Sequence, residues 1–506
     1  KFVAYDPFFE TANDSYVALA TKQSLAGADY AIKKTNGAWS LVGSASSISG
    51  GIIRAIIVAA PDCVYLGGGF TNVGDANGDG VVKYNPITNT FTSLGIGGGT
   101  VYCMALAPNG DLYVGGIFGS MGGVANTSCM ARWDGSAWNS LSATQPNNTV
   151  LAMVFDHSGN LYIGGDFTDL ADANGDYISK WDGSTYSSLG IGMSGGVYAL
   201  AVDPGIMVNN QFVNKVVAGG IFTAAGGVAN TDKIALWNGS AWTSISSGIT
   251  GTAVFSLAYG SDYALYAGGL FTVIGGTTAS NIAKYVSATW YPLGSGVGSY
   301  VYRMMVAGGL LYVGGAFTSA GGLTLGDRVV TWNGTMWGLL DVDLPGSPSV
   351  YAIFVNGSET YLGYTTAGTA TSSYATTTVT NTGSATSYPT ISIKRSGGTS
   401  ATLQWLKNET TGARLLFNYP ILDGEIITID LTQGSRGITS TYVPLGYNDD
   451  GRNIIGSILS GSSLSTWGLA PGSNTISLYI SDVGSPTMTA YMIWRPKYWS
   501  VDGAIS

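Results

Sequence analysis

Two stretches of the sequence alternate oxygen-bearing side chains with small residues. Asp75-Ala-Asn-Gly-Asp79 is echoed by Asp172-Ala-Asn-Gly-Asp176, and this alternation resembles the start of a calcium-binding loop, where carboxylate and amide oxygens surround the ion. The twelfth position of such a loop supplies a bidentate glutamate, but this chain has proline or glycine there. Ordinary turn chemistry is therefore the favoured interpretation. A structural calcium ion is the alternative, and its ligands would be Asp75, Asn77, Asp79, Asp172, Asn174 and Asp176.

Side chains that carry nucleophilic, histidine-based or zinc chemistry are scarce. His157 is the only histidine of the sequence, and its setting in Asp-His-Ser-Gly-Asn predicts an exposed turn. Cys63, Cys103 and Cys129 are too few for a disulfide framework and are expected to be small apolar core residues. No glycine-rich loop followed by Lys-Ser/Thr is present to hold a phosphate. Folding can still bring two carboxylates together, but the residues favour a protein that is not an enzyme, with no cofactor beyond the possible calcium.

Aromatic residues are numerous, with 13 Trp and 30 Tyr, and aromatic rings can stack on sugars. Most of them recur at fixed positions of repeated strands, which predicts packing in the core or between repeats. Tyr186 and Tyr300, with the loops near them, are candidates for lining a glycan site, although the sequence assigns none.

Charge and hydropathy exclude two classes of partner. The formal net charge is −9 without any basic run, whereas a nucleic-acid surface needs clustered Lys and Arg. No apolar stretch reaches the roughly 18 residues that span a bilayer; the longest, residues 51–60, is interrupted by Arg54 and is typical of a buried strand. Because the chain opens with Lys1 rather than Met, we expect a processed or truncated start.

The sequence repeats itself, and Gly-Gly-x-Phe is the clearest mark of each repeat. Each repeat splits into four strand-sized pieces, among them an apolar run such as VYCMALA, an LYVGG-type run, and a run that ends at Asp-Gly or Asn-Gly. These two dipeptides are hairpin signals. Four short antiparallel strands per repeat describe the blades of a β-propeller. The motif ends at Phe70, Phe118, Phe167, Phe222, Phe271 and Phe317.

The order of the strand pieces predicts how the ring closes. Each type of piece occurs seven times, but the chain begins with a third and a fourth strand and ends, at Tyr364, with a first and a second. Pairing residues 29–42 with 350–364 completes the seventh blade and covers two strand edges. We therefore predict an all-β chain with a seven-bladed β-propeller over residues 29–364 and two-plus-two strand closure.

A second β-domain is expected after the propeller. Residues 365–374 are rich in Thr, Ser and Ala, which predicts a linker. From about Thr376 a period-2 alternation returns, in runs such as YPTISIK and EIITIDL that are separated by turn residues. A β-sandwich over residues 375–506 is the simplest interpretation, and residues 1–28 form an N-terminal lead-in.

An ordered set of short motifs in this second domain resembles a known family. The set comprises Thr-Asn-Thr-Gly (380–383), Pro389, Lys-Asn-Glu-Thr-Thr-Gly (407–412), Asp-Gly-Glu-Ile-Ile-Thr-Ile-Asp (423–430), Trp-Gly-Leu-Ala-Pro-Gly-Ser-Asn-Thr-Ile (467–476) and a terminal Trp-Arg-Pro-Lys-Tyr-Trp. It is similar to the C-terminal galectin-like sandwich of siphovirus-type distal tail proteins, in which these residues shape turns and core and none is catalytic. Residues 1–10 resemble the exit from that family's N-terminal ring domain, which is absent from this sequence; the resemblance implies a propeller inserted between ring domain and sandwich.

The resemblance implies a non-enzymatic structural component of a phage or phage-like tail tip, located in the virion tail or otherwise extracellular. The propeller would project outward, either as a spacer or to contact a glycan or protein of the host surface. Other tail or baseplate proteins, and further copies in a hexamer or trimer, would be its partners. Two alternatives stay open: a secreted or cell-surface propeller that binds glycan or protein, and a propeller hydrolase or lyase. No nucleic-acid partner and no membrane span are expected.

Overall fold

The computed structural model describes residues 15–18, 24–25 and most of 30–494. Within 30–494 it leaves out residues 36–37, 44–47, 49–50, 75–77, 96, 205–206, 209–210, 213–214, 322, 325–327, 336, 341–343, 345–347, 357–358, 366–369, 372–373, 383, 397–399, 433–435, 442–451, 454–461, 464 and 484–486. The described chain is all-β and divides into two units, residues 25–370 and residues 1–24 with 371–506. No helix in these described ranges is long and apolar enough to cross a membrane.

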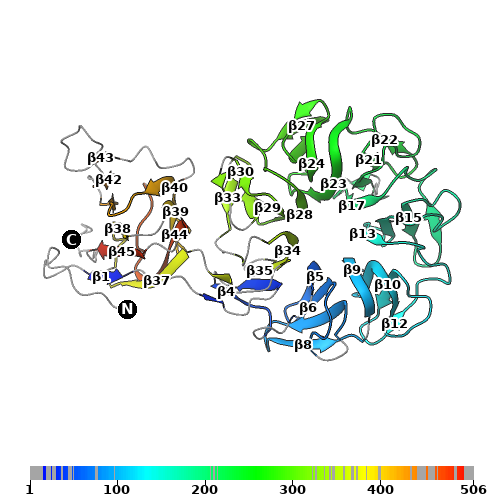
Figure 1. Cartoon of the computed structure of the whole chain (residues 1–506), viewed down its shortest axis with the longest axis horizontal. Helices are drawn as coiled ribbons and strands as arrows, with labels where there is room; N and C mark the ends of the chain where they lie inside the picture. Colours follow the sequence, from blue (N-terminus) through cyan, green and yellow to red (C-terminus); the bar gives the residue numbers. More distant parts are fainter. Residues whose placement is uncertain are drawn as a thin grey trace. The chain divides into compact units, whose positions relative to one another are not determined.

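Residues 25–370 form a β-propeller whose blades follow one another around a common axis (Figure 1). Each blade is an antiparallel sheet with four main strands, and the sheet of blade 5 has a short fifth strand beside them. The four strands follow the sequence order from the inner strand to the outer one, except in blade 7. Blade 1 comprises β5 (Ile53–Ala60), β6 (Cys63–Gly68), β7 (Val81–Asn85) and β8 (Thr90–Ser93); blade 2, β9 (Gly97–Leu106), β10 (Leu112–Met121), β11 (Met130–Trp133) and β12 (Trp138–Asn139); blade 3, β13 (Val150–Phe155), β14 (Leu161–Gly165), β15 (Ile178–Trp181) and β16 (Tyr186–Ser188). Blade 4 comprises β17 (Val197–Val202), β20 (Val216–Gly220), β21 (Ile234–Trp237) and β22 (Trp242–Thr243); blade 5, β23 (Ile249–Tyr259), β24 (Leu265–Ile274), β26 (Ile282–Val286) and β27 (Thr289–Pro292); blade 6, β28 (Val301–Ala307), β29 (Leu310–Gly315), β32 (Val329–Trp332) and β33 (Trp337–Leu339).

Blade 7 is built from both ends of this unit. Its strands are β34 (Val350–Asn356), β35 (Glu359–Tyr364), β3 (Ala31–Thr35) and β4 (Ala38–Leu41), and β3 pairs with β35 so that Ala31 faces Gly363. The inner strands contact one another in the order β5, β9, β13, β17, β23, β28 and β34, and β34 contacts β5. The predicted clasp between residues 29–42 and 350–364 is therefore confirmed, and the ring is closed.

The propeller also contains short strands outside the four main strands of each blade. The hairpin of β18 (Met207–Val208) and β19 (Gln211–Phe212) lies between the first two strands of blade 4. Strand β25 (Thr277–Thr278) pairs with β24, and β30 (Ser319–Ala320) pairs with β31 (Leu323–Thr324). Where the chain enters and leaves the propeller, β2 (Ser24–Leu25) pairs with β36 (Ala370–Thr371).

The packing between blades explains the Gly-Gly-x-Phe repeat. A Cβ on the first glycine, such as Gly164, would lie 2.5 Å from Cγ1 of Val197 in the next blade. A Cβ on the second glycine, such as Gly165, would lie 2.1 Å from the carbonyl oxygen of Thr149, which precedes the inner strand of the same blade. Both positions therefore require the residue without a side chain. The phenylalanines that follow, Phe167 among them, are buried.

Four tryptophans tie the outer strand of one blade to the preceding blade. Trp242 is buried, and its indole N–H donates to the carbonyl oxygen of Leu189 at the end of blade 3, at 2.8 Å. Trp138, Trp290 and Trp337 donate in the same way to Leu94, Ile245 and Leu293. We call these four bonds the tryptophan latch. They confirm that the outer-strand aromatics pack between blades.

The second unit consists of two antiparallel sheets with one hydrophobic core. The six-stranded sheet has the order β1 (Ser15–Ala18), β45 (Thr487–Trp494), β38 (Thr390–Ser396), β41 (Ile426–Asp430), β42 (Gly437–Ser440) and β43 (Arg452–Asn453). The four-stranded sheet has the order β37 (Tyr374–Asn381), β44 (Gly472–Val483), β39 (Ser400–Asn408) and β40 (Arg414–Ile421). Core residues come from both sheets, for example Ile391 and Leu403. Because β1 pairs with β45, the propeller is an insertion in the chain of this unit. The sequence analysis predicts an inserted propeller too, but it assigns residues 1–28 to a separate lead-in.

Several motif residues of the second unit are buried and fix its turns. The side-chain amide of Asn381 donates to the carbonyl oxygens of Ala385 and Leu469, at 2.9 and 3.0 Å. Asn408 donates to the carbonyl of Gly468 at 2.7 Å and to the side chain of Asn474 at 3.1 Å. Residues 1–10, Gly383 and the residues after Trp494, which also carry the family resemblance, lie outside the described residues.

Candidate binding site at the channel mouth

The inner strand of every blade contains the same three-residue pattern. Its first residue is a buried valine or isoleucine, such as Val197 or Val301, which packs between blades. At the second residue the pairing with the next strand shifts, for instance between Val197 and Ala199, so that a β-bulge lies there. A bulge re-aims one side chain out of the regular alternation. The same shift recurs in all seven blades, within the ranges Ile53–Ala55, Val101–Cys103, Val150–Ala152, Val197–Ala199, Val254–Ser256, Val301–Arg303 and Val350–Ala352.

The bulged residues form a ring at one end of the propeller axis. We call Tyr102, Tyr198, Phe255, Tyr302 and Tyr351, together with Arg54, the aromatic belt; Leu151 holds the corresponding position in blade 3. All of these residues are half-buried. Inner strands begin at this end of the axis and the second strands finish there. The belt therefore surrounds the mouth of the central channel on the face that carries the loops between second and third strands.

The belt residues contact one another around the mouth. The rings of Tyr198 and Phe255 are stacked, with centroids 5.6 Å apart and planes at 6°. Tyr302 and Tyr351 are stacked at 4.6 Å and 13°, and Phe255 meets the Tyr302 ring edge-on at 6.0 Å. The guanidinium of Arg54 lies over Tyr351 at 4.9 Å and over Tyr102 at 4.7 Å, a double cation–π contact. The side chains thus fix each other's positions before any ligand arrives.

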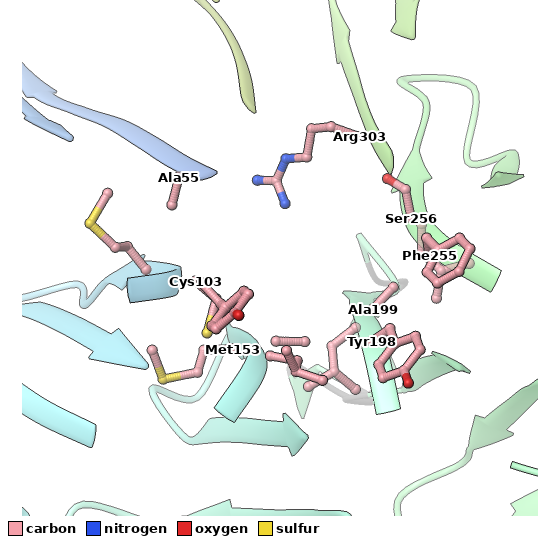
Figure 2. Close-up of a pocket in the computed structure, with 14 residues that line it drawn as sticks. Ala55, Cys103, Met153, Tyr198, Ala199, Phe255, Ser256 and Arg303 are labelled. Atoms are coloured by element: carbon pink, nitrogen blue, oxygen red, sulfur yellow. The ribbon is translucent and has the colours of Figure 1, made fainter. Parts of the chain in front are cut away.

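A cavity in the channel is lined by residues of the inner strands, among them Tyr102, Tyr198 and Phe255 of the belt and the residues that follow them. The third residue of the pattern is small in most blades, as in Ala55, Ala152, Ala199 and Ala352, and is Cys103 in blade 2 and Ser256 in blade 5. In blade 6 it is Arg303, whose side chain extends into the cavity (Figure 2). The cavity offers about 70 Å³ to the centres of water-sized molecules. Because a single water needs roughly 10–15 Å³ on this measure, several waters or a small chemical group fit.

The titratable groups of the site are perturbed mainly by burial. Burial, followed by the neighbouring Tyr351, raises the pKa of Tyr302 to about 12, so its phenol is neutral at pH 7. Burial also raises the pKa of Tyr198, and the nearby Asp166 carboxylate adds to this shift. Burial raises the pKa of Asp166 itself. Asp166 follows the Gly-Gly pair of blade 3 and places one carboxylate beside the belt.

The cavity holds a thiol and a guanidinium close to each other. Burial raises the pKa of the Cys103 thiol, while the positive charge of Arg303 opposes this shift. Cys103 Sγ donates a weak hydrogen bond to the carbonyl of Val150 at 3.8 Å. Cys63 is buried, as the sequence predicts for a core cysteine, whereas Cys103 also lines the channel and is only partly buried.

The residues that the sequence singled out for sugar contact are not brought together. Tyr300 lies beside the belt and stacks on Tyr302 at 5.6 Å. Tyr186 lies in the outer strand of blade 3, packs on Trp181 at 4.7 Å, and has a buried hydroxyl without a hydrogen-bond partner in the described structure. His157 is exposed, as predicted, with Nε2 3.1 Å from the carbonyl oxygen of Asp203.

The predicted calcium ligands are partly described, and those residues form turns. Asp176 Oδ1 accepts the backbone N–H of Asp169 at 3.1 Å, and Asp79 Oδ1 accepts that of Asn72 at 2.9 Å. Asp172 Oδ1 accepts the N–H of Asn174 at 2.7 Å. Asp75 and Asn77 lie outside the described residues. Among the residues described, no three His, Cys, Asp or Glu side chains are grouped to hold a metal ion. Calcium binding stays a prediction.

The aromatic belt is the feature that sequence reasoning missed. The runs VYCMALA, VYALAV and VYRMMVA contain Tyr102, Tyr198 and Tyr302, but they look like continuous apolar strands. The available signal was the aromatic at the second position of the inner strand in five of the seven repeats. A regular strand would turn that side chain to one blade face, whereas the bulge turns it to the channel.

No family model and no curated protein matches the chain. Among solved structures, the computationally designed Ika8 protein is 16% identical, with a TM-score of 0.38 over 63% of this chain and 96% of that one. A putative gluconolactonase is 11% identical, with a TM-score of 0.32 over 70% of this chain and 97% of that one. An exo-beta-1,3-galactanase from Phanerochaete chrysosporium is 11% identical, with a TM-score of 0.24 over 95% of this chain and 100% of that one. Similarities at this level say nothing about function, and the propeller architecture rests on the strand pairing given above.

Proposed function

We propose that this chain is a non-enzymatic binding protein and that its propeller takes a saccharide at the channel mouth. The observation that carries the proposal is the aromatic belt: five aromatic side chains from five blades, re-aimed by β-bulges and left half-exposed around one opening. Packing alone would bury such rings, because large apolar surfaces are favourable to remove from water. A ring of half-exposed aromatics instead supports contact with a ligand.

The chemistry of the belt fits a sugar. A saccharide presents C–H groups on its ring faces and hydroxyl groups around its edge. The half-exposed aromatic rings offer apolar surface with a negative π-face for the C–H groups. The neutral phenols of Tyr198 and Tyr302 can donate to hydroxyl oxygens, and the Asp166 carboxylate beside Tyr198 can accept from a hydroxyl.

The same residues argue against a hydrolase. Retaining and inverting glycosidases generally use two carboxylates that face each other across the scissile bond. The residues that line the cavity include neither Asp nor Glu, and Asp166 is the one carboxylate that the described belt region places beside a belt ring. These observations support binding without turnover.

A glycan array tests the proposal on the full chain. We expect wild type to bind a subset of saccharides, Tyr302→Ala to lose at least about tenfold in affinity, and Tyr302→Phe, which keeps the ring, to retain most of it. An array without any signal, or unchanged binding by Tyr302→Ala, would refute the belt as a sugar site. Cleavage of a bound oligosaccharide by wild type but not by Asp166→Asn would favour the hydrolase or lyase alternative.

We also propose that the second unit is a galectin-like β-sandwich that anchors the propeller in a phage or phage-like tail tip. Two observations support this role: the sheets share one core, and β1 and β37 flank the propeller in sequence, so that the propeller is an insertion with a single entry and exit. Negative-stain microscopy and light scattering of the full chain test it. Three- or sixfold rings are expected, and a monomer that does not bind isolated tails would contradict the tail-tip role.

A further inference from the structure

Arg303 breaks the pattern of the channel wall. The six equivalent positions carry Ala, Cys or Ser, and only blade 6 places a long cationic side chain there. The guanidinium extends into the cavity toward the strands of blades 1 and 2, which contribute Ala55 and Cys103 (Figure 2). One cation thus occupies a space that the repeat otherwise lines with small residues.

The described structure gives this cation no acidic partner. The side chains that line the cavity include neither Asp nor Glu, and the ion pairs recorded among the described residues do not involve Arg303. Arg303 is exposed to solvent, because its side chain lies in the open channel. The protein around the guanidinium still lowers the pKa of Arg303 by desolvation, but a guanidinium stays protonated in proteins. A single positive charge between low-dielectric walls focuses its field along the channel and attracts an anion.

A hydrogen-bonding group lies next to this charge. Ser256 Oγ accepts the backbone N–H of Met304 at 2.8 Å, which leaves its own O–H able to donate to a group in the cavity. The guanidinium offers paired N–H donors that match the two oxygens of a carboxylate. The cavity volume of about 70 Å³ is adequate for a group of that size.

We propose that the channel binds an anionic group on Arg303, and that this group is the carboxylate of an acidic saccharide seated on the aromatic belt. This assignment of the ligand class rests on the proposed sugar site. Anion binding at Arg303 does not depend on the sugar site, because a free small anion such as acetate or chloride can bind the same guanidinium. Arg54, at the mouth, adds a second positive charge on the path inward.

Calorimetric titration of the full chain tests whether the bound anionic group is the carboxylate of a saccharide. Methyl glucuronide and methyl glucoside serve as matched probes at constant ionic strength. We expect wild type to prefer the glucuronide by about tenfold, since charge-assisted bidentate hydrogen bonds are stronger than neutral ones. Arg303→Gln should bind both glycosides with the affinity that wild type shows for the glucoside. Arg303→Lys, which keeps the charge without the fork, should keep a reduced preference. The control Arg132→Gln removes an equal charge outside the channel, where Arg132 pairs with Asp111, and should resemble wild type.

Each possible result of these titrations either supports or overturns a part of the proposal. Equal affinity of wild type for both glycosides, or a preference that survives in Arg303→Gln, overturns the carboxylate assignment. If neither glycoside binds, the proposed sugar site is wrong. The anion site is then tested by measuring the melting temperature with added acetate or chloride, because a ligand that binds only the folded state raises that temperature. A rise in wild type that is absent in Arg303→Gln supports the anion site. No rise in wild type overturns it.

Discussion

The propeller has two sets of aromatic side chains arranged around its axis. One is the tryptophan latch on the outer strands, and the other is the aromatic belt around the channel mouth. In the latch, Trp242 is 4% exposed and donates its indole N–H to the preceding blade. In the belt, Tyr198 and Tyr302 are half-exposed and stack on other rings of the belt. Both sets of aromatic residues repeat with the period of the blades.

The latch and the belt differ in the conformation of the backbone that carries their aromatic side chains. The outer tryptophans occupy regular strand positions and face a glycine at positive φ, as Trp242 faces Gly226 (φ 56°). The inner aromatics occupy bulges, which turn them from the blade interface into the channel. Periodicity therefore marks both the packing tryptophans and the aromatics of the proposed binding site, and the local backbone distinguishes the two sets. The predictions below test this division.

The largest effect is expected from removing a latch tryptophan. Trp242→Ala should lower the free energy of unfolding by about 3–5 kcal/mol, since it empties a buried site and removes the shorter of the two hydrogen bonds to the Leu189 carbonyl. Tyr198→Ala in the same blade should cost only about 1 kcal/mol, because its ring is half-exposed. Guanidinium chloride unfolding measures both. Equal losses would show that the belt is as structural as the latch.

A smaller effect is expected where a glycine faces the latch. A Cβ at Gly226 would lie 2.8 Å from Cδ1 of Trp242, so Gly226→Ala should destabilise the fold through both backbone strain and overpacking. Gly227 has a similar φ of 69°, and its Cβ would meet only Ile191, at 3.4 Å. We expect Gly226→Ala to cost about 1–2 kcal/mol more than Gly227→Ala in thermal unfolding. A difference near zero would contradict the close fit of the latch.

The loops of blades 1 and 3 offer a test that involves neither the tryptophan latch nor the aromatic belt. If Asp75, Asn77, Asp79 and their counterparts Asp172, Asn174 and Asp176 hold calcium, EDTA should lower the melting temperature and added calcium should restore it. The expected stabilisation is about 1 kcal/mol at a few-fold excess of calcium over Kd. Magnesium serves as the control ion. An unchanged melt, with no calcium found by elemental analysis, would rule out the site.

The smallest effect concerns Asp166 at the edge of the belt. Because burial raises its pKa, the folded chain holds the proton more tightly than the unfolded chain does. The stability from this group is thus fully present below the ordinary aspartate pKa and is lost as pH rises through the folded-state value. Asp166→Asn should therefore be more stable than wild type at pH 7, by less than about 1 kcal/mol because the group is partly exposed, and equal near about pH 3. A difference that does not vary with pH would contradict the buried carboxylate.

The repeat made most of the propeller predictable from sequence. Gly-Gly-x-Phe located the blades because both glycines are sterically required at the end of the second strand, as Gly164 is against the next blade and Gly165 is against the start of its own inner strand. The clasp followed from the order of strand types, and β3 and β35 do pair. The place of Ser15–Ala18 in the six-stranded sheet was not predictable, because a four-residue strand carries no sign of a partner more than 450 residues away.

The candidate site was largely hidden for a physical reason. Alternation along a strand assigns side chains to two faces, and a bulge suspends that rule at the residue of interest. Arg303 carried a different kind of signal, since it departs from the small residues at the equivalent positions of the other repeats. In this propeller, recurring residues include both the packing tryptophans and the belt aromatics, whereas Arg303 stands out because it departs from the repeat.

A crystal structure of the full chain with the saccharide that binds most tightly tests the central claim most directly. We expect the sugar at the channel mouth, with its ring against Tyr302 and Tyr351 and any carboxylate directed at Arg303. A sugar bound elsewhere, whether on the outer loops or on the two-sheet unit, with the belt unchanged and in contact only with water, would contradict it.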